Sequence, residues 1–164
     1  MASSRRSDFD AKINLSVFDR LIDTDPDAKQ EPPQSRMQTL RELKRSVKRD
    51  LEWLLNSRRM VVDIDPNLEE THRSIITYGL SDITCTPLSG SKDQRALAEQ
   101  VETAIKLFAP NLMDVQITCM PPNEMERSVS LRIEAKIDME PAPEPIVFDT
   151  VLQMGNGEFG VKES

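Results

Sequence analysis

Residues 46–58 read SVKRDLEWLLNSR and contain the strongest helical pattern in this chain of 164 residues. The pattern begins earlier, because apolar side chains recur every three or four positions from Met37 to Ser57. These positions are Leu40, Leu43, Val47, Leu51, Leu54 and Leu55. No Gly or Pro interrupts them. The spacing predicts a helix over residues 37–57 with one buried face, and we expect Trp53 and Leu54 in the core.

The opposite face of this predicted helix is basic. It carries Arg41, Lys44, Arg45, Lys48 and Arg49. A row of charges on a helix is usually a solvated face. The row can also dock an acidic neighbour, in which case Arg45, Lys48 and Arg49 are candidate binding residues. The sequence leaves both interpretations open.

The 35 residues before this helix have a different composition. Residues 1–12 are polar, and residues 23–35 (DTDPDAKQEPPQS) are rich in proline and charge, which predicts a flexible linker. The segment between them has one apolar face, formed by Leu15, Phe18, Leu21 and Ile22. Their spacing predicts a short amphipathic helix over residues 15–22. Two turns of helix are marginal in water. We therefore expect this helix to dock, with Leu15, Phe18 and Leu21 as candidate partner-binding residues.

Residues 60–91 have a less regular pattern. Val61, Val62 and Ile64 predict a short strand that Asp65-Pro66 ends. Residues 68–78 predict a short helix with Gly79 as its cap. Residues 84–91 predict a loop.

A second long helix is predicted from Ser91, as N-cap, to Ala109. Its apolar stripe consists of Leu97, Val101, Ala104, Ile105 and Phe108. Pro110 ends it, because proline cannot continue a helix.

The C-terminal third alternates with period two, which predicts strands. Apolar residues alternate with polar ones over residues 115–119 and again over 129–139. A third strand is predicted at 146–154, and Gly155-Asn156-Gly157 predicts a tight turn into a fourth at 158–161. Residues 121–127 and the EPAPEP stretch predict loops. The chain is therefore expected to be α+β, with N-terminal helices packed on a small, mainly antiparallel sheet. Residues 36–164 are expected to form one domain, preceded by the flexible segment 1–35.

Charge is distributed unevenly along the chain. Residues 1–60 hold 13 Lys/Arg against 10 Asp/Glu, a net charge of +3, and residues 61–164 hold 8 against 18, a net of −10. The acidic C-terminal part argues against nucleic-acid binding, which needs clustered positive charge. Apolar residues make up 38% of the chain. This low fraction fits a protein that completes its burial against partners, or a domain diluted by disordered tails.

Residues with catalytic or ligand chemistry are sparse. His72 is the single histidine, and with Cys85 and Cys119 it does not make a usual zinc set. No catalytic triad, phosphate loop or cofactor motif is recognisable, so no catalytic, cofactor or metal residue is assigned. The carboxylates of Asp63, Asp65, Glu69 and Glu70 are expected to solvate the surface.

Location in the cell is expected from the same features. The two cysteines lack CxxC spacing and fit reduced thiols in the cytoplasm. No apolar run approaches the length of a membrane span, and the N-terminus has no secretory h-region. We expect no direct membrane insertion.

Several stretches together resemble the TssE subunits of type VI secretion baseplates, in the gp25-like family. The run DLEWLLN at residues 50–56 is the most specific of them. VFDRLID at 17–23, SIITYGLSD at 74–82 and FDT at 148–150 resemble further family elements, in the family's order. The resemblance implies an α+β fold, no chemistry, and a cytoplasmic protein assembled into a baseplate near the inner membrane. The implied partners are the wedge proteins TssF and TssG, TssK-like proteins, and sheath and hub or spike components.

One element departs from the family pattern. Relatives carry a Glu-Pro-Arg motif at the end of the second long helix, and it contributes to core contacts of the baseplate and to sheath assembly. Here residues 108–112 read FAPNL, so Ala109 and Asn111 replace the two charges. The resemblance makes five residues of this stretch candidates for partner binding: Phe108, Ala109, Pro110, Asn111 and Leu112.

Two other functions remain to be weighed against a structural subunit. A bacterial anti-adaptor shares the gp25-like fold, so a regulatory protein-binding module is one alternative. A glycan hydrolase acting on peptidoglycan is the other, and it requires an essential carboxylate pair. The low aromatic content of 4% disfavours sugar binding.

Overall fold

The computed structural model describes residues 19, 21–22, 36–82, 90–120, 128–139, 142–153, 155 and 157–163. Within them the elements are α2 (Arg36–Asn56), α3 (Glu69–His72), the 3₁₀ helix η1 (Ile75–Thr77), α4 (Ser91–Phe108), β1 (Leu112–Cys119), β2 (Ser128–Ile137), β3 (Glu144–Gln153) and β4 (Glu158–Glu163). Leu15 and Phe18, the linker at 23–35, most of the loop at 84–91 and the loop at 121–127 lie outside the described residues.

The four strands form one antiparallel sheet in chain order, β1–β2–β3–β4. β2 and β3 pair along their whole length, from Ser128 opposite Gln153 to Ile137 opposite Glu144. The predicted turn between β3 and β4 is confirmed. Gly157 has a φ of +70°, and its N–H donates to the carbonyl of Gln153 at 2.8 Å. The predicted α+β class is correct, and the predicted strands at 129–139 and 146–154 are close to β2 and β3.

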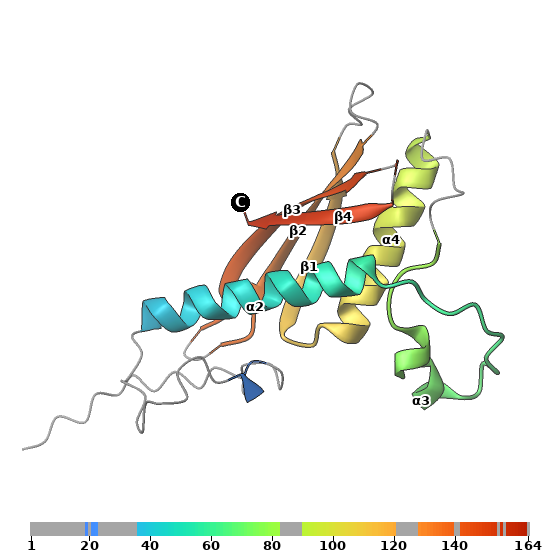
Figure 1. The fold of residues 1–164 in the computed structure, drawn as a ribbon, viewed down its shortest axis with the longest axis horizontal. Coiled ribbons are helices and arrows are strands. Elements are labelled where there is room, and N and C mark those ends of the chain that lie inside the picture. Colours follow the sequence, from blue (N-terminus) through green and yellow to red (C-terminus); the bar gives the residue numbers. More distant parts are fainter. Residues whose placement is uncertain are drawn as a thin grey trace, which may run out of the picture.

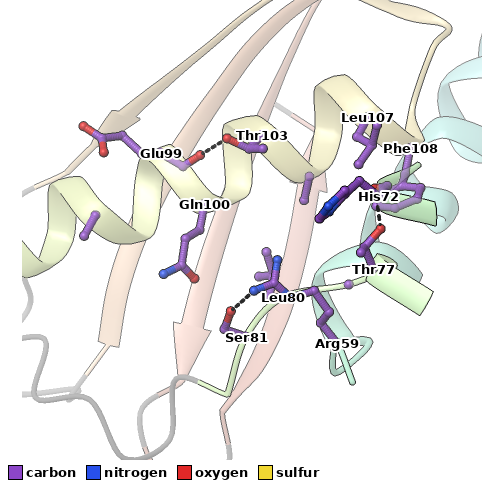
Figure 2. Close-up of a pocket in the computed structure, with 13 residues that line it drawn as sticks. Arg59, His72, Thr77, Leu80, Ser81, Glu99, Gln100, Thr103, Leu107 and Phe108 are labelled. Carbon is purple, nitrogen blue, oxygen red and sulfur yellow. Dashed lines mark hydrogen bonds between the residues drawn. The ribbon is translucent and has the colours of Figure 1, made fainter. Parts of the chain in front are cut away.

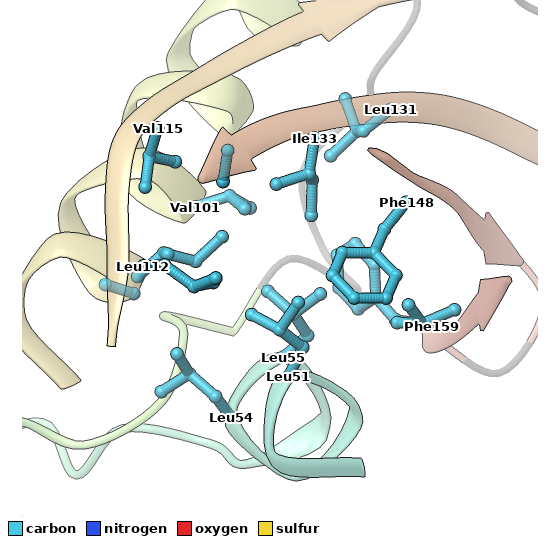
Figure 3. Packing of buried hydrophobic residues seen from close by; sticks show 14 of the residues in the cluster. Leu51, Leu54, Leu55, Val101, Leu112, Val115, Leu131, Ile133, Phe148 and Phe159 are labelled. Atoms are coloured by element: carbon cyan, nitrogen blue, oxygen red, sulfur yellow. The ribbon is translucent and has the colours of Figure 1, made fainter. Parts of the chain in front are cut away.

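Helices α2 and α4 lie against the same face of the sheet, and the side chains between them form the core (Figures 1 and 3). α2 packs on β4 and α4 packs on β1. Leu51 from α2, Ile105 from α4 and Phe148 from β3 are each at most 1% exposed. The helix predicted at 37–57 is confirmed as α2, and Leu54 is buried as expected. We refer to α2, α4 and the four strands as the helix–sheet body.

The outer edge of β4 is held by side chains of α2. Asn56 donates from Nδ2 to the carbonyl of Phe159 at 3.0 Å, and its Oδ1 accepts the N–H of Phe159 at 2.8 Å. Glu52 accepts the N–H of Val161 at 3.4 Å. Edge backbone groups that are already paired are less able to take up another strand. Glu52 and Asn56 both belong to the DLEWLLN run, so part of that run fastens α2 to the sheet.

β1 begins three residues earlier than the alternation predicts, at Leu112. Its register with β2 shifts between Met113 and Gln116, which is a β-bulge. Within the bulge Asp114 has a φ of +52°, in the left-handed region that Asp tolerates better than most residues. The bulge breaks the period of two, and therefore the pattern gave no strand signal there.

The segment between α2 and α4, residues 58–82, runs away from the helix–sheet body and carries α3 and η1 (Figure 1). The strand predicted at Val61, Val62 and Ile64 is wrong, because these residues have no regular structure and no strand among the described residues pairs with them. The helix predicted at 68–78 is interrupted at Arg73 and Ser74 and becomes α3 and η1. We call residues 58–82 the α2–α4 segment.

The α2–α4 segment is tied back to the body at Gly79 and Leu80. Leu80 donates its N–H to the carbonyl of Ser57 at 2.9 Å, and its own carbonyl accepts the N–H of Arg59 at 2.8 Å. Gly79 has a φ of +97°, and a Cβ there would lie 2.3 Å from the Ser57 carbonyl oxygen. Only glycine fits, because it combines positive φ with close approach to another backbone.

α4 starts and ends as the sequence indicates, with one correction. The residue at the N-cap position is Gly90, not Ser91, and it makes no side-chain cap hydrogen bond. α4 ends at Phe108, with Ala109 as C-cap, and the predicted apolar stripe faces the sheet.

Candidate partner-binding surface

A groove of about 270 Å³ lies where the end of α4 meets α2. One wall consists of the five residues 108–112 that the family pattern singles out. The other wall comes from α2 and includes Asp50, Trp53 and Leu54, and Tyr78 also lines the groove. A volume near the lower end of ligand pockets suits one or two side chains of a protein partner better than a large cofactor.

The five residues 108–112 differ in how they contribute to this groove. Phe108 and Ala109 are half-buried against the core, and Leu112 is buried. Pro110 is exposed, and the carbonyl of Asn111 accepts the N–H of Asp138 at 2.9 Å. The apolar members therefore build the groove, while positions 109 and 111 carry the changed side chains at its wall. No finding tests their role in partner binding, which stays a prediction.

Two aromatic residues complete the groove. The Tyr78 ring stands edge-on to Phe108, with ring centroids 5.1 Å apart and planes at 70°. This is a favoured geometry for aromatic pairs. Burial, and secondarily the charge of Asp50, raises the pKa of the Tyr78 hydroxyl. Sequence reasoning placed Tyr78 at a helix end and did not connect it to Phe108, which lies 30 residues further along the chain.

Trp53 is not in the core, contrary to the prediction from the helical pattern. It is 48% exposed at the groove, on the flank of α2 between the buried and solvated faces. The Arg49 guanidinium carbon lies 5.0 Å from the centre of its ring, a cation–π contact. A large aromatic ring that is half exposed beside a groove is typical of a protein-binding anchor.

Arg49 also links α2 to the N-terminal part of the chain. Its two terminal nitrogens donate to the two carboxylate oxygens of Asp19, at 2.7 and 3.2 Å. Ser46 donates a hydrogen bond to the same carboxylate, and Asp50 accepts from Arg49 at 2.9 Å. These bonds raise the pKa of the Arg49 guanidinium, the one with Asp19 most. A forked pair of this kind fixes orientation as well as charge.

The remaining charges of the basic face are partly paired within the chain. Lys44 lies 3.0 Å from Glu163, and Lys48 lies 3.9 Å from Glu52. Arg45 is exposed and forms no ion pair with the residues that the structure describes. Of the predicted trio Arg45, Lys48 and Arg49, the structure therefore leaves mainly Arg45 facing solvent. Whether this face binds a partner stays a prediction.

Near Asp19, Leu21 is 78% exposed and Ile22 is also exposed. Asp19 thus contacts α2 while the apolar side chain of Leu21 remains open to solvent. Leu21 is consistent with the predicted partner-binding role, which no finding tests.

A larger cavity of about 550 Å³ separates the α2–α4 segment from α4 (Figure 2). Glu99, Gln100 and Thr103 line it from the helix, and Arg59 and His72 line it from the segment. The His72 Nε2 lies 3.2 Å from the carbonyl of Asp65, and Thr77 donates to the carbonyl of His72 at 2.7 Å. These bonds position the histidine within its own segment.

Asp63, Asp65, Glu69 and Glu70 lie exposed on the α2–α4 segment, as expected. Asp65 accepts the N–H of Asn67 at 2.9 Å and thereby caps a turn. Within the described ranges, no three or more His, Cys, Asp or Glu side chains gather as a metal site would require. In the same part of the chain, no helix is both long and apolar enough to cross a membrane.

A helical layer on one face of an antiparallel sheet, with a half-exposed aromatic groove at its end, defines an α+β protein. The sequence profile of the baseplate wedge protein gp25 matches residues 41–142, which is more than half of the chain. The chain therefore belongs to the gp25 baseplate wedge family. No curated protein matches it significantly.

The profile match covers both walls of the groove and the α2–α4 segment. It identifies a structural role in a baseplate and an association with other baseplate components as the family's function. β3 and β4 lie entirely beyond the matched range.

Proposed function

We propose that this protein is the TssE-type subunit of a type VI secretion baseplate wedge and acts without catalysis. In this role it binds TssF- and TssG-like proteins, fixes them in register, and helps to template the contractile sheath. It assembles in the cytoplasm, near the inner membrane. The DLEWLLN run and the three further stretches support the type VI assignment within the wider gp25 family.

The groove at residues 108–112 is the observation that carries the proposal. It combines an exposed indole, an edge-on aromatic pair and an apolar floor, which together suit a buried anchor from a neighbouring protein. Its wall is also the place where relatives carry a charged tripeptide. Here that wall is uncharged at positions 109 and 111, so it contributes shape and apolar contact.

Co-expression of the full chain with the TssF- and TssG-like proteins of its own genome tests the proposal. Size-exclusion chromatography with mass determination should give a stoichiometric complex. Trp53→Ala should weaken this complex by about tenfold or more if the indole is an anchor, because such residues often contribute 2 kcal/mol or more. Arg45→Glu is the comparison variant for the basic face of α2. It reverses one charge on that face and leaves the groove intact, so the two variants distinguish the contributions of the two surfaces.

A chain that stays monomeric and binds neither wedge protein would overturn the proposal. In that case cleavage of peptidoglycan and binding of a single regulatory partner become the assays to run. A complex that forms equally well with Trp53→Ala would keep the wedge role and exclude the groove as its main contact.

A further inference from the structure

Most of the exposed large apolar side chains among the described residues belong to the α2–α4 segment. Ten large apolar side chains are exposed among the described residues, and six of them lie between residues 60 and 76. The six are Met60, Val61, Val62, Leu68, Ile75 and Ile76. Val61 is 96% exposed and Ile75 is 85% exposed. Single exposed apolar residues are normal, but such a concentration marks an interaction site.

The first part of this stretch, residues 60–64, also lacks backbone pairing within the described residues. The N–H of Arg59 donates to the carbonyl of Leu80, which is the last backbone bond before a gap. Over residues 60–64, no backbone group bonds to another backbone group in the described part of the chain. A cavity of about 280 Å³ lies between this stretch and the side chains of His72, Thr77 and Ser81. The side chains of residues 60–63 are exposed, and Ile64 is half-buried.

The composition of residues 60–64 (MVVDI) favours a strand, because β-branched residues fit a pleated backbone. The strand is absent because nothing in the body lies beside it. Packing of the hydrophobic core does not explain why apolar residues occur at 60–64, because the core cluster contains none of them. An unpaired, apolar stretch of high strand propensity is the kind of backbone that another chain completes.

The charges around the stretch indicate the chemistry of that chain. Asp63, Asp65, Glu69 and Glu70 are all exposed on the α2–α4 segment. Arg58 is engaged by Asp82 at 2.5 Å, and Arg59 donates to Ser81 at 3.2 Å. Arg59 and Arg73 keep their positive charges, but residues 58–82 hold five Asp or Glu against three Arg, a net charge of −2. This moderate acidic excess favours a partner that carries Lys or Arg beside its apolar residues.

We propose that residues 60–64 pair as a β-strand with an extended segment of a TssF- or TssG-like wedge protein, one with apolar side chains flanked by Lys or Arg. This inference rests on the proposed function and names a second contact, separate from the groove. The unpaired N–H and carbonyl groups supply the pairing, and Val61 and Val62 supply apolar contact. The acidic side chains select the basic flanks.

Amide hydrogen exchange of the full chain, alone and in complex with the wedge proteins, tests the pairing directly. In the free chain the amides of residues 60–64 should exchange fast, because no backbone acceptor among the described residues protects them. In the complex we expect their exchange to slow by about a hundredfold, as ladder hydrogen bonds form. Unchanged exchange at these amides in a complex that has formed would overturn the proposal.

Lysine substitutions test the apolar and charge parts of the same proposal. Val61→Lys should weaken the complex by about tenfold or more, because it brings a cation to a basic partner in an apolar contact. Met120→Lys is the control, since Met120 is exposed outside the segment. It should change the affinity less than about twofold. Thermal unfolding confirms that both variants fold.

The outcomes separate this inference from the proposed function. If the unmodified chain forms no complex with the wedge proteins, both fail. If it forms the complex and Val61→Lys binds equally well, the wedge role stands and the pairing at residues 60–64 is wrong.

Discussion

Apolar side chains are buried in one part of this protein and exposed in another. In the helix–sheet body, Leu51, Ile133 and Phe148 are exposed by at most 1%, whereas in the α2–α4 segment Val61 is exposed by 96%. Both parts contain apolar residues of similar kinds. In the body their spacing follows a helix or strand period, so they share a face that another layer covers. In the segment, no layer among the described residues covers residues 60–63. The body therefore accounts for folding, whereas the exposed side chains of the segment are the ones that we propose a partner covers.

The largest loss of stability is expected from a substitution at Gly79, where the α2–α4 segment meets the helix–sheet body. Gly79→Ala places a Cβ 2.3 Å from the Ser57 carbonyl oxygen at a φ of +97°. Strain in the left-handed region and displacement of the backbone together should lower the free energy of unfolding by about 3–5 kcal/mol. Denaturant unfolding measures it. Gly160→Ala is the control, because nothing lies within 4 Å of a Cβ at that position. Equal stability of the two variants would contradict the account of Gly79.

The body and the segment should respond differently to the same loss of apolar volume. Leu51→Ala is expected to lower the free energy of unfolding by roughly 2–5 kcal/mol, because it leaves a cavity in the core. Val61→Ala should change it by less than about 0.5 kcal/mol, because the side chain is already in water. Chemical denaturation of both variants gives the comparison. A similar cost for the two would show that Val61 is packed in solution.

The bonds between α2 and the edge of β4 give an intermediate effect. Asn56→Ala removes both bonds to the backbone of Phe159 and should cost about 1–3 kcal/mol. Faster amide exchange at Phe159 would accompany it, because that N–H loses its acceptor. An unchanged unfolding midpoint would mean that α2 is held on the sheet by apolar contact alone.

Removal of one buried polar group, the Thr150 hydroxyl, is expected to increase stability. The Thr150 hydroxyl is fully buried and has no hydrogen-bond partner among the described residues. Thr150→Val should raise the free energy of unfolding by about 1 kcal/mol, because the unsatisfied hydroxyl is removed with little change in shape. Thermal unfolding measures the change. Destabilisation by this substitution would indicate that the hydroxyl does find a partner.

The smallest effect concerns Tyr78, the single tyrosine of the chain. Burial raises its pKa, so the phenolate absorbance should titrate at higher pH in the folded chain than after unfolding. The neutral form is favoured in the folded state. Its contribution to stability is therefore complete below the unfolded pKa and is lost as pH rises through the folded pKa. Asp50→Asn should move the folded titration back toward ordinary values. Identical titrations in both states would place Tyr78 in water.

The sequence was sufficient to predict the helices and strands whose apolar residues follow a clear period. α2, α4 and β2 follow their patterns closely, because each has a single buried face and few breaks. The turn at Gly157 was also readable, since positive φ demands glycine or a close substitute. Local rules fix these elements.

The sequence failed where distant parts of the chain decide the outcome. Val61 and Val62 have strand propensity but no neighbouring strand, and Trp53 lies on a flank of α2 that the helical period does not resolve. Residues 108–112 were found through the family pattern. Their partner across the groove, Tyr78, depends on tertiary packing that no local pattern encodes.

The most direct test of the central claim uses Trp53, the single tryptophan of the chain. Fluorotryptophan incorporated into this chain alone gives one ¹⁹F resonance at the groove. Addition of the unlabelled TssF- and TssG-like proteins should shift and broaden that resonance, because a partner covers the half-exposed indole. A resonance that stays at its free position in the presence of excess wedge proteins would contradict the account of the groove as the wedge-binding surface.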